Sequence, residues 1–285
     1  MRIDLIKYQA LGNDYLVMDL PGPVDALVPS LPVVCHPHYG LGSDGLLAFD
    51  PSALTVRIFN PDSSEAQRSG NGLRIAAAHA VLEHGAASEF SLSTMAGASR
   101  VRVLSRNGPL VVSELDIGRP SFRAADLPAL VPDEPQLVEI ETPVGRVRAA
   151  LVSVGNPHCV VFDEEVSARR VMELGPVLEQ HRLFPERINV QLVSVLGRDR
   201  ARIEIWERGA GYTLASGTSA SAVAAALMRE GLVGDEVTIV MPGGELKVRR
   251  SSEGSLIQRG PAQRVYRAWL ELDELVGVRL PGGSG

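Results

Sequence analysis

The chain has 285 residues, of which 45% are apolar and 22% charged, with a formal net charge of −6 and a pI near 5.6. Its length suits two lobes of about 140 residues each better than one core. The acidic balance and the lack of a basic stripe exclude nucleic acid as the main partner.

Residues 1–15 have no long apolar core, so we expect neither a signal peptide nor a membrane anchor. Two cysteines, Cys35 and Cys159, are too few for a disulfide framework, which suits a reducing cytoplasm.

Alternating apolar and polar residues predict a strand over Ile3–Tyr8, a turn at Gly12–Asp14 and a second short strand over Val17–Leu20. Gly40–Gly45 has the glycine spacing of a dinucleotide-binding loop. That motif needs a helix after it, whereas Leu46–Phe49 is strand-like, so we interpret the glycines as a turn.

Thr55–Asn60 is a further predicted strand, and the turn-forming segment Pro61–Ser64 follows it. After the loop Ser69-Gly70-Asn71-Gly72, the run Leu73–His84 is apolar on most sides. This pattern predicts a helix enclosed by other structure, and Gly85 is a suitable end for it.

Short strand-like segments continue to about Gly118, and the proline-rich Arg119–Pro135 is predicted to cross between lobes. The second half then repeats the plan of the first. A strand over Arg202–Glu207 and a turn over Arg208–Tyr212 precede the loop Ser216–Ser219. An enclosed helix over Ala220–Glu230 follows, ended by Gly231. The two Ser-Gly loops lie 147 residues apart, at 69 and 216, which indicates two related halves.

We therefore predict an α+β fold of two pseudo-symmetric lobes, each a curled mixed sheet around a buried central helix, with a ligand in the cleft between them. The N-terminal lobe comprises residues 1–120 and is rejoined by a strand from about 262–275. The C-terminal lobe comprises residues 121–261, and residues 276–285 form a tail.

The two Ser-Gly loops are suited to binding an anion. A helix N-terminus offers unpaired N–H groups and a partial positive charge, which favour a carboxylate. Gly70, Gly72 and Gly217 allow the backbone to approach a ligand closely, and Asn71 and Thr218 are plausible N-caps. Under a pseudo-twofold axis, the two loops would carry Ser69 and Ser216 to opposite faces of one small anion. The alternative is two ordinary capped helices.

Seven motifs of the chain resemble, in order and spacing, those of the diaminopimelate epimerase family, and the resemblance covers nearly the whole chain. They are Gly12-Asn13-Asp14, Asn60-Pro61-Asp62, Ser69-Gly70-Asn71-Gly72, Gly155-Asn156-Pro157-His158, Arg187-Ile188-Asn189, Trp206-Glu207-Arg208-Gly209 and Ser216-Gly217-Thr218.

The resemblance implies proton transfer at the α-carbon of an amino acid, without a cofactor or a metal. It also implies that backbone N–H groups around the two loops hold the substrate carboxylate and that His158 assists near the reacting centre. The side chains that would hold the substrate are Asn13, Asn60, Asn156, Asn189, Glu207 and Arg208. The partner is then a small amino acid or related carboxylate, with no membrane involved, and a homodimer is a reasonable expectation.

Taken alone, these residues also have structural interpretations. The three asparagines Asn13, Asn60 and Asn156 lie in turn-forming contexts, where asparagine is common for backbone reasons. Glu207 and Arg208 could form a solvated pair at a strand end, and His158 could be structural.

The chain departs from the family where the family carries its two cysteines, because Ser69 and Ser216 stand there. A thiol has a pKa of about 8.5, whereas an aliphatic hydroxyl is closer to water, at about 15.7. The gap of roughly 7 units corresponds to about 10 kcal/mol, of which a helix dipole supplies only about 0.3–2 kcal/mol. A neighbouring base could activate serine, and His158, Glu207 and Asp62 are the candidates.

Two further positions, Tyr212 and Ser219, also depart from the family pattern, which favours glutamate and often glycine there. Several functions are therefore open. The first is a racemase or epimerase of a free amino acid, with diaminopimelate as the default substrate. The second is another acid–base or cyclisation step on a small acid in specialised biosynthesis, and the third is ligand binding without catalysis.

A metal site and a serine hydrolase are two further alternatives. A metal site could form from Cys35, His36 and His38, although Pro37 and the surrounding turn residues also explain this tract as a loop. A serine hydrolase has the least support, because neither serine lies in a G-x-S-x-G elbow.

Overall fold

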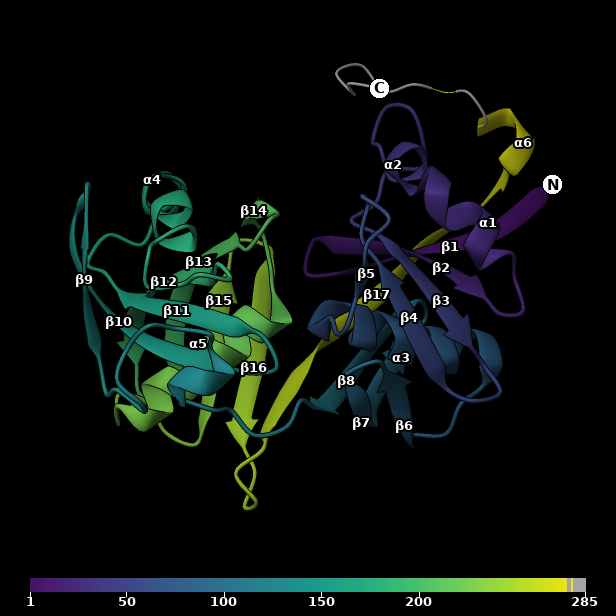
Figure 1. Ribbon diagram of the computed structural model, residues 1–285. Helices are drawn as coiled ribbons and strands as arrows, with labels where there is room; N and C mark the ends of the chain where they lie inside the picture. The colour runs from purple at the N-terminus through teal and green to yellow at the C-terminus, as the bar shows by residue number, and fades with distance from the viewer. Residues whose placement is uncertain (276–277, 279–285) are drawn as a thin grey trace. The chain divides into compact units, whose positions relative to one another are not determined.

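The computed structural model describes residues 1–275 and 278, and it divides into two compact units. Unit 1 comprises Met1–Leu115 with Pro261–Gly285, and unit 2 comprises Asp116–Gly260 (Figure 1). The predicted tail of residues 276–285 lies, apart from Val278, outside the described residues. Within the described part, no helix is long and apolar enough to cross a membrane.

Unit 1 is a curled mixed sheet around one helix, α3 (Gly70–His84). Strands β1 and β2 are antiparallel, β2 and β3 are parallel, β3 and β4 are antiparallel, and β4 runs parallel to β6. The strands are β1 (Arg2–Ala10), β2 (Asn13–Asp19), β3 (Leu46–Asp50), β4 (Thr55–Phe59), β5 (Glu65–Ala66), β6 (Glu89–Thr94), β7 (Gly97–Asn107) and β8 (Leu110–Asp116). The short helices α1 (Val24–Leu27), η1 (Val28–Ser30) and α2 (Leu31–Val34) lie between β2 and β3, and α6 (Leu272–Leu275) follows the last strand.

Unit 2 has the same plan around α5 (Gly217–Arg229). Its strands are β9 (Val138–Thr142), β10 (Gly145–Ser153), β11 (Pro157–Phe162), β12 (Asn189–Gly197), β13 (Arg200–Glu207), β14 (Gly211–Thr213), β15 (Glu236–Met241) and β16 (Gly244–Arg250). Helix α4 (Ala168–Glu179) lies between β11 and β12. The long strand β17 (Leu256–Glu271) begins in unit 2, where it pairs with β16, and continues into unit 1, where it pairs with β1.

The pairing register confirms the predicted internal repeat. Thr55 pairs with Ser93 between the parallel strands β4 and β6, and Arg202 pairs with Val240 between β13 and β15. Both partners in unit 2 lie 147 residues after those in unit 1, the same spacing that separates Ser69 from Ser216. The offset also holds for Glu89 with Arg102 and Glu236 with Arg249. The strands that flank each helix are therefore equivalent residue by residue.

The two central helices are enclosed, as their composition predicts. In α3 the alanines from Ala76 to Ala78 are fully buried, and the helix contacts β1, β2, β3 and β6. Small side chains let the sheet approach the helix on several sides. Gly85, with φ 63°, ends α3 in the left-handed conformation that glycine tolerates best.

Three local predictions were wrong. Both helices begin three residues before the expected Leu73 and Ala220, because the preceding serines cap them at Gly70 and Gly217. The strand expected over Val17–Leu20 begins at Asn13, so the turn is shifted to Leu11 and Gly12. The segment Arg119–Pro135 does not cross between units, because it belongs to unit 2.

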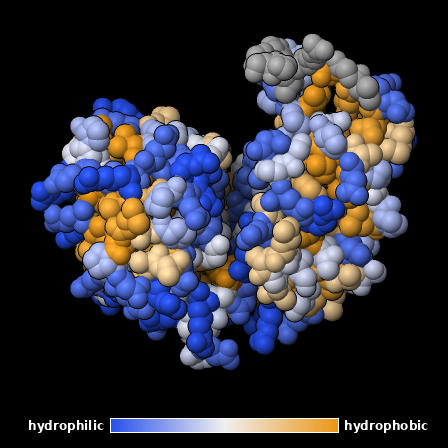
Figure 2. Space-filling view, viewed as in Figure 1, coloured by the Kyte–Doolittle hydropathy of each residue, from blue (hydrophilic) through white to orange (hydrophobic). Residues whose placement is uncertain are grey.

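Contacts in unit 2 explain the place of this last segment. Ser121 exchanges backbone hydrogen bonds with Ser153, and the side chain of Leu127 is buried in the core of that unit. On the face drawn in Figure 2, apolar residues form separate patches among hydrophilic ones.

Candidate functional site

In unit 1 the centre of the candidate site is the N-terminus of α3. Ser69 has an extended backbone, φ −140° and ψ 123°, and its Oγ accepts a hydrogen bond of 3.0 Å from the N–H of Gly72. Ser69 is therefore the N-cap, and the prediction that Asn71 has this role was wrong. Asn71 lies inside the first turn, because the helix begins at Gly70.

In unit 2 the N-terminus of α5 has the same geometry. Ser216 has φ −142° and ψ 124°, and its Oγ accepts a hydrogen bond of 3.3 Å from the N–H of Ser219. A second contact of 3.3 Å joins Ser216 Oγ to Thr218 Oγ1. Thr218 is thus within the first turn, and its prediction as N-cap was wrong for the same reason. Each unit presents a serine hydroxyl beside the first N–H groups of a buried helix.

A polar network fixes Asn13 beside the loop of unit 1. The buried Asn71 donates from Nδ2 to Asn13 Oδ1 over 3.0 Å, and Asn13 Nδ2 donates to Asp44 Oδ2 over 2.7 Å. Arg74, itself fully buried, donates to Asn71 Oδ1. Burial raises the pKa of the Asp44 carboxyl. The structure therefore brings Asn13 and Asn71 together, although they are 58 residues apart in the chain.

Tyr15 is a residue that the sequence analysis missed. Its side chain is 6% exposed, and its hydroxyl lies 3.4 Å from Ser69 Oγ. Alternation along β2 places Tyr15 on the same side of the strand as Asn13, which is the signal that could have identified it. Within residues 1–275 and 278, the hydrogen-bond partners of Ser69 Oγ are this hydroxyl and the N–H of Gly72.

Asn60 and Asp62 form a turn at the end of β4. Asn60 Nδ2 donates to Ser64 Oγ over 2.9 Å, and Asp62 Oδ1 accepts from the N–H and hydroxyl of Ser64 over 3.0 and 2.6 Å. The bond from the Ser64 hydroxyl is the main cause that lowers the pKa of Asp62. Asp62 was a candidate base for a serine, but the structure uses its carboxylate within the turn.

His158 is fully buried in unit 2, and its Nε2 lies 2.9 Å from Asn156 Oδ1. Burial lowers the pKa of His158 to about 3, so the imidazole is neutral near pH 7. Such a weak base is unsuited to activating a serine whose own pKa is far higher. A neutral hydrogen-bonding role fits His158 better than the candidate role of general base.

Gln191 is a second residue that the sequence analysis missed. It donates from Nε2 to Ser219 Oγ over 3.0 Å, and the N–H of Ser219 donates to Ser216 Oγ. Gln191 also interacts with His158, where it favours the protonated imidazole and so opposes part of the pKa shift that burial causes. The bond from Gln191 to Ser219 ties β12 to the serine loop of unit 2.

Asn189 and Glu179 hold the Trp206-Glu207-Arg208-Gly209 motif in place. Asn189 Oδ1 accepts the N–H of Arg208 over 3.0 Å. The carboxylate of the buried Glu179 accepts Trp206 Nε1 over 2.7 Å and the N–H of Gly209 over 2.9 Å. Glu207 thus ends β13 in a fixed turn, 147 residues after Asn60 at the end of β4.

The side chain of Arg208 is exposed and donates to the Glu186 carbonyl over 3.1 Å. This motif is therefore not simply a solvated charge pair at a strand end. Its two charged residues are carried on a backbone that buried side chains hold.

The metal site considered for Cys35, His36 and His38 does not form. Cys35 is buried in the core of unit 1, and burial raises the pKa of its thiol to about 12. His36 Nδ1 instead accepts backbone N–H groups of His38 and Tyr39. Burial likewise raises the pKa of Cys159 to about 12, so neither cysteine is a ready nucleophile.

Solved structures with a similar fold include proteins named as racemases and epimerases. A probable proline racemase from Agrobacterium radiobacter has a TM-score of 0.70 at 19% identity and covers 96% of this chain and 94% of its own. A hydroxyproline epimerase from Agrobacterium vitis has a TM-score of 0.68 at 18% identity, covering 94% and 92%. This likeness shows that the chain has the fold of these proteins.

Sequence comparison is more specific. The profile described as diaminopimelate epimerase matches residues 5–122 and 150–265. Diaminopimelate epimerase 2 from Nostoc sp. is 40% identical over 254 residues, covering 85% of this chain and 87% of the relative. A diaminopimelate epimerase from Moorella thermoacetica is 38% identical over 280 residues, covering 94% and 99%. The chain belongs to the diaminopimelate epimerase family.

Proposed function

We propose that this protein interconverts stereoisomers at the α-carbon of an amino acid, with Ser69 and Ser216 as the residues that accept and donate the proton. One observation carries the proposal: each unit caps its central helix with a serine in nearly the same conformation, φ −140° and −142°. Family membership supports the reaction class. Diaminopimelate is the first substrate to test, because relatives that are 38–40% identical are named for it.

We propose that the substrate carboxylate binds the N–H groups of Gly70, Asn71, Gly217 and Thr218. The first N–H groups of a helix lack intrahelical partners, and the helix dipole favours an anion there. We propose that a set of polar side chains holds the remaining polar groups of the substrate. These are Asn13, Asn60, Asn156, Asn189, Glu207 and Arg208, with His158 as a neutral hydrogen-bonding group.

Serine makes the proton transfer demanding. The gap of about 10 kcal/mol between a serine and a cysteine base is reduced by about 1.5–3 kcal/mol for a hydrogen bond to the charged form, and by at most about 2 kcal/mol for the helix dipole. A free alkoxide is therefore not the resting state. As Ser69 Oγ takes the α-proton, its own proton must pass to water, and the Tyr15 hydroxyl, which donates to Ser69 Oγ, is placed to stabilise the negative charge that develops there.

Solvent deuterium exchange tests the proposal. The protein is incubated in deuterium oxide with each stereoisomer of diaminopimelate, and deuterium at the α-carbon is followed by proton NMR and mass spectrometry. We expect exchange together with interconversion of stereoisomers. Ser69→Ala and Ser216→Ala are each expected to lower the rate by about 10²–10⁴-fold, the usual contribution of a general acid or base.

Ser167→Ala is the matched control. Ser167 caps α4 in unit 2 with the same kind of bond, 3.2 Å from the N–H of Arg170. Its loss costs a comparable amount of stability, about 0.5–2 kcal/mol, without touching the proposed site. Equal activity of the wild-type and Ser69→Ala proteins would refute the role of the serine.

A second function is favoured by the serines themselves. The two serine loops could bind a small acid for another acid–base or cyclisation step. A serine hydroxyl is protonated near pH 7, so it is better suited to donating a proton or a hydrogen bond than to acting as a free base. No deuterium incorporation with diaminopimelate or other amino acids, together with thermal stabilisation by a small carboxylate, would favour this function or ligand binding alone. Homodimer formation also stays a prediction, and sedimentation analysis tests it.

A further inference from the structure

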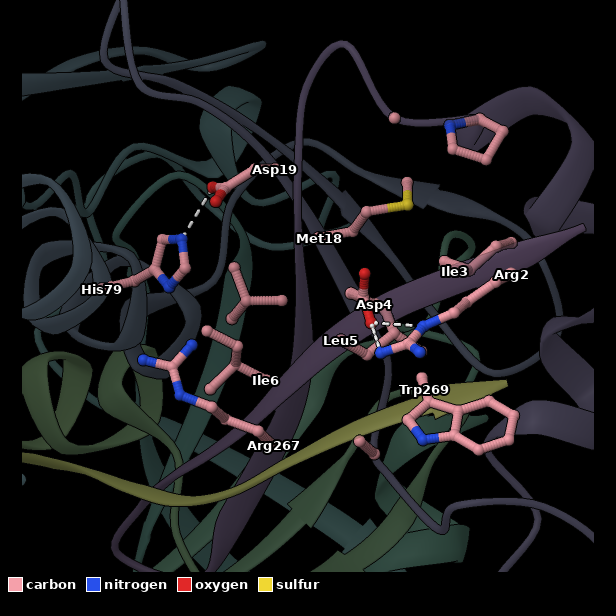
Figure 3. A pocket seen from close by; sticks show the side chains of 14 residues that line it. Arg2, Ile3, Asp4, Leu5, Ile6, Met18, Asp19, His79, Arg267 and Trp269 are labelled. Carbon is pink, nitrogen blue, oxygen red and sulfur yellow. Dashed lines mark hydrogen bonds and ion pairs between the residues drawn. The ribbon is translucent and has the colours of Figure 1, made fainter. Parts of the chain in front are cut away.

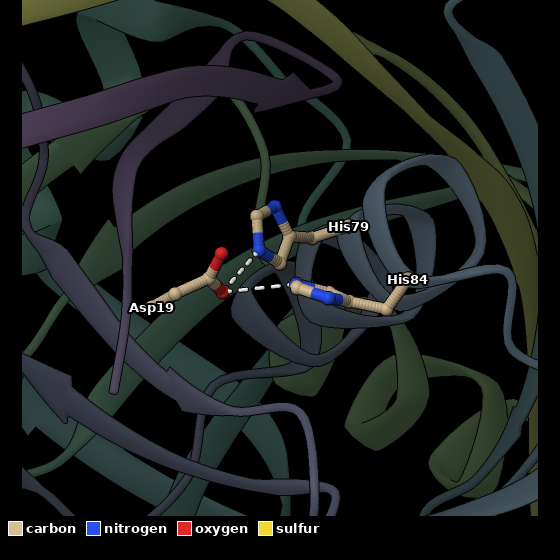
Figure 4. A group of neighbouring side chains, drawn as sticks. All are labelled: Asp19, His79 and His84. Carbon is tan, nitrogen blue, oxygen red and sulfur yellow. Dashed lines mark hydrogen bonds and ion pairs between the residues drawn. The ribbon is translucent and has the colours of Figure 1, made fainter. Parts of the chain in front are cut away.

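At the C-terminal end of α3, unit 1 carries a second cluster of polar groups. Asp19 ends β2, whereas His79 and His84 lie in the last turns of α3. Asp19 Oδ1 lies 2.8 Å from His79 Nε2 and 3.1 Å from His84 Nε2 (Figure 4). His79 is ten residues after Ser69, so at 1.5 Å per residue the cluster lies about 15 Å along the helix from the serine loop. It is separate from the proposed catalytic groups.

We propose that Asp19, His79 and His84 bind one divalent transition-metal ion of the zinc type. One ligand atom from each side chain lies within 4.8 Å of the others. Two imidazoles and one carboxylate form a common zinc ligand set, and a tetrahedral ion with bonds of about 2.0–2.1 Å separates its ligands by about 3.4 Å. The distances from Asp19 Oδ1 to the two Nε2 atoms, 2.8 and 3.1 Å, are shorter than this, so rotations of the side chains would be needed to admit the ion.

A chain of hydrogen bonds orients His79 for this role. Its Nδ1 lies 3.1 Å from the Tyr8 hydroxyl, which donates to Glu83 Oε1 over 3.4 Å. The Glu83 carboxylate also accepts from Arg264 and Arg267, so it stays an acceptor. Because Tyr8 gives its proton to Glu83, its oxygen can accept the Nδ1 proton of His79. When an ion is bound, this contact would keep the proton on Nδ1 and leave Nε2 free to bind the metal.

Aromatic packing fixes both imidazoles. The Phe49 ring meets His79 edge to face, with centroids 5.2 Å apart, and stacks on His84 at 5.7 Å. His79 is 1% exposed, whereas Asp19 is 41% and His84 27% exposed, so an ion can enter from the solvent side.

Asp19 and His79 also line a cavity of about 570 Å³ in unit 1 (Figure 3). The bound ion would join the end of β2 to the end of α3. The opposite ends of these two elements carry Tyr15 and Ser69, so the ion would help to hold α3 in its place against β2.

Cobalt titration of the chelator-treated full chain tests the proposal, because Co²⁺ bound by nitrogen and oxygen ligands absorbs visible light. We expect one Co²⁺ per chain, displacement by Zn²⁺, and a higher melting temperature with either metal. Asp19→Asn and His84→Ala are expected to weaken binding by at least about 100-fold. Tyr8→Phe is expected to weaken it by about 10-fold, through the orientation of His79.

The control is the double variant His36→Ala with His38→Ala, which removes the other neighbouring pair of histidines and should bind the metal as the wild type does. Circular dichroism checks that each variant is folded. No metal uptake by the wild-type chain, or equal binding by the folded Asp19→Asn and His84→Ala variants, would overturn the proposal. Loss of binding in the His36 and His38 control would overturn it as well.

Discussion

Replacement of both serines by cysteine tests the proton chemistry most directly. In Ser69→Cys with Ser216→Cys, each new thiol lies at a helix N-terminus, where a thiol with an unperturbed pKa of about 8.5 becomes more acidic. The change removes the difference of about 10 kcal/mol between a serine and a cysteine base. Cysteine is a poorer N-cap, so we expect each substitution to cost up to about 1 kcal/mol of stability.

The assay is deuterium exchange at the α-carbon of diaminopimelate, measured across pH. An unperturbed thiol is about 3% ionised at pH 7, and this fraction rises about tenfold per pH unit until the pKa is approached. We therefore expect the double-cysteine protein to exchange faster than the wild type, with a rate that rises from about pH 6 to 8.5. A folded double-cysteine protein with no gain and no new pH dependence would refute our assignment of the two serines.

Three further predictions concern neighbouring groups. Tyr15→Phe should lower the exchange rate by about tenfold with little change in KM. The reason is that the Tyr15 hydroxyl contacts Ser69 and not a side chain proposed to bind the substrate. An unchanged kcat would contradict this. Gly72→Ala places a Cβ 3.2 Å from Ser69 Oγ and 3.3 Å from Leu47 Cδ2, so we expect a loss of activity of about tenfold or more and a melting temperature within a few degrees of the wild type. For His158, whose pKa falls from 6.5 to about 3 on folding, the unfolded chain binds more protons in this range, so stability is lost as pH falls from 6.5 toward 3. His158→Gln should lose this part of the pH dependence in denaturant unfolding.

The sequence predicted the features that local patterns encode. Alternation predicted the strands around each loop, and the alanine-rich composition of Leu73–His84 predicted an enclosed helix. The identity of the N-caps was not predictable from composition, because Ser69 and Asn71 are both good capping residues. Only the backbone shows that Ser69 is extended and that the helix already includes Asn71.

Contacts between distant segments were the main omission. Tyr15 reaches Ser69 across 54 residues, and Asp19 reaches His79 across 60. Both depend on how β2 lies against α3, and that follows from the pairing of β2 with β1 and β3. In the sequence, His79 and His84 belong to an apolar helical run, where a histidine is more simply interpreted as part of the core.

The internal repeat makes the two loops alike in backbone and different in chemistry. Gln191 of β12 and Leu47 of β3 hold equivalent positions, because they pair with Ile205 and Ile58, which lie 147 residues apart. Leu47 lies beside Gly72, whereas Gln191 donates to the fully buried Ser219. A buried hydroxyl needs such a partner. Where unit 1 has Gly72 in the loop and Leu47 in the sheet, unit 2 therefore has Ser219 and Gln191.

Ser69 therefore has the Tyr15 phenol beside it, whereas Ser216 contacts Thr218 and the N–H of Ser219, whose hydroxyl accepts from Gln191. Two acids in unlike surroundings differ in the free energy of losing a proton. We predict that Ser69→Ala and Ser216→Ala slow exchange unequally when the reaction is started from one stereoisomer, and that the order reverses when it is started from the other. Initial deuterium incorporation from each pure stereoisomer measures this, and equal effects from both would show that the two serines do not act on separate faces of the α-carbon.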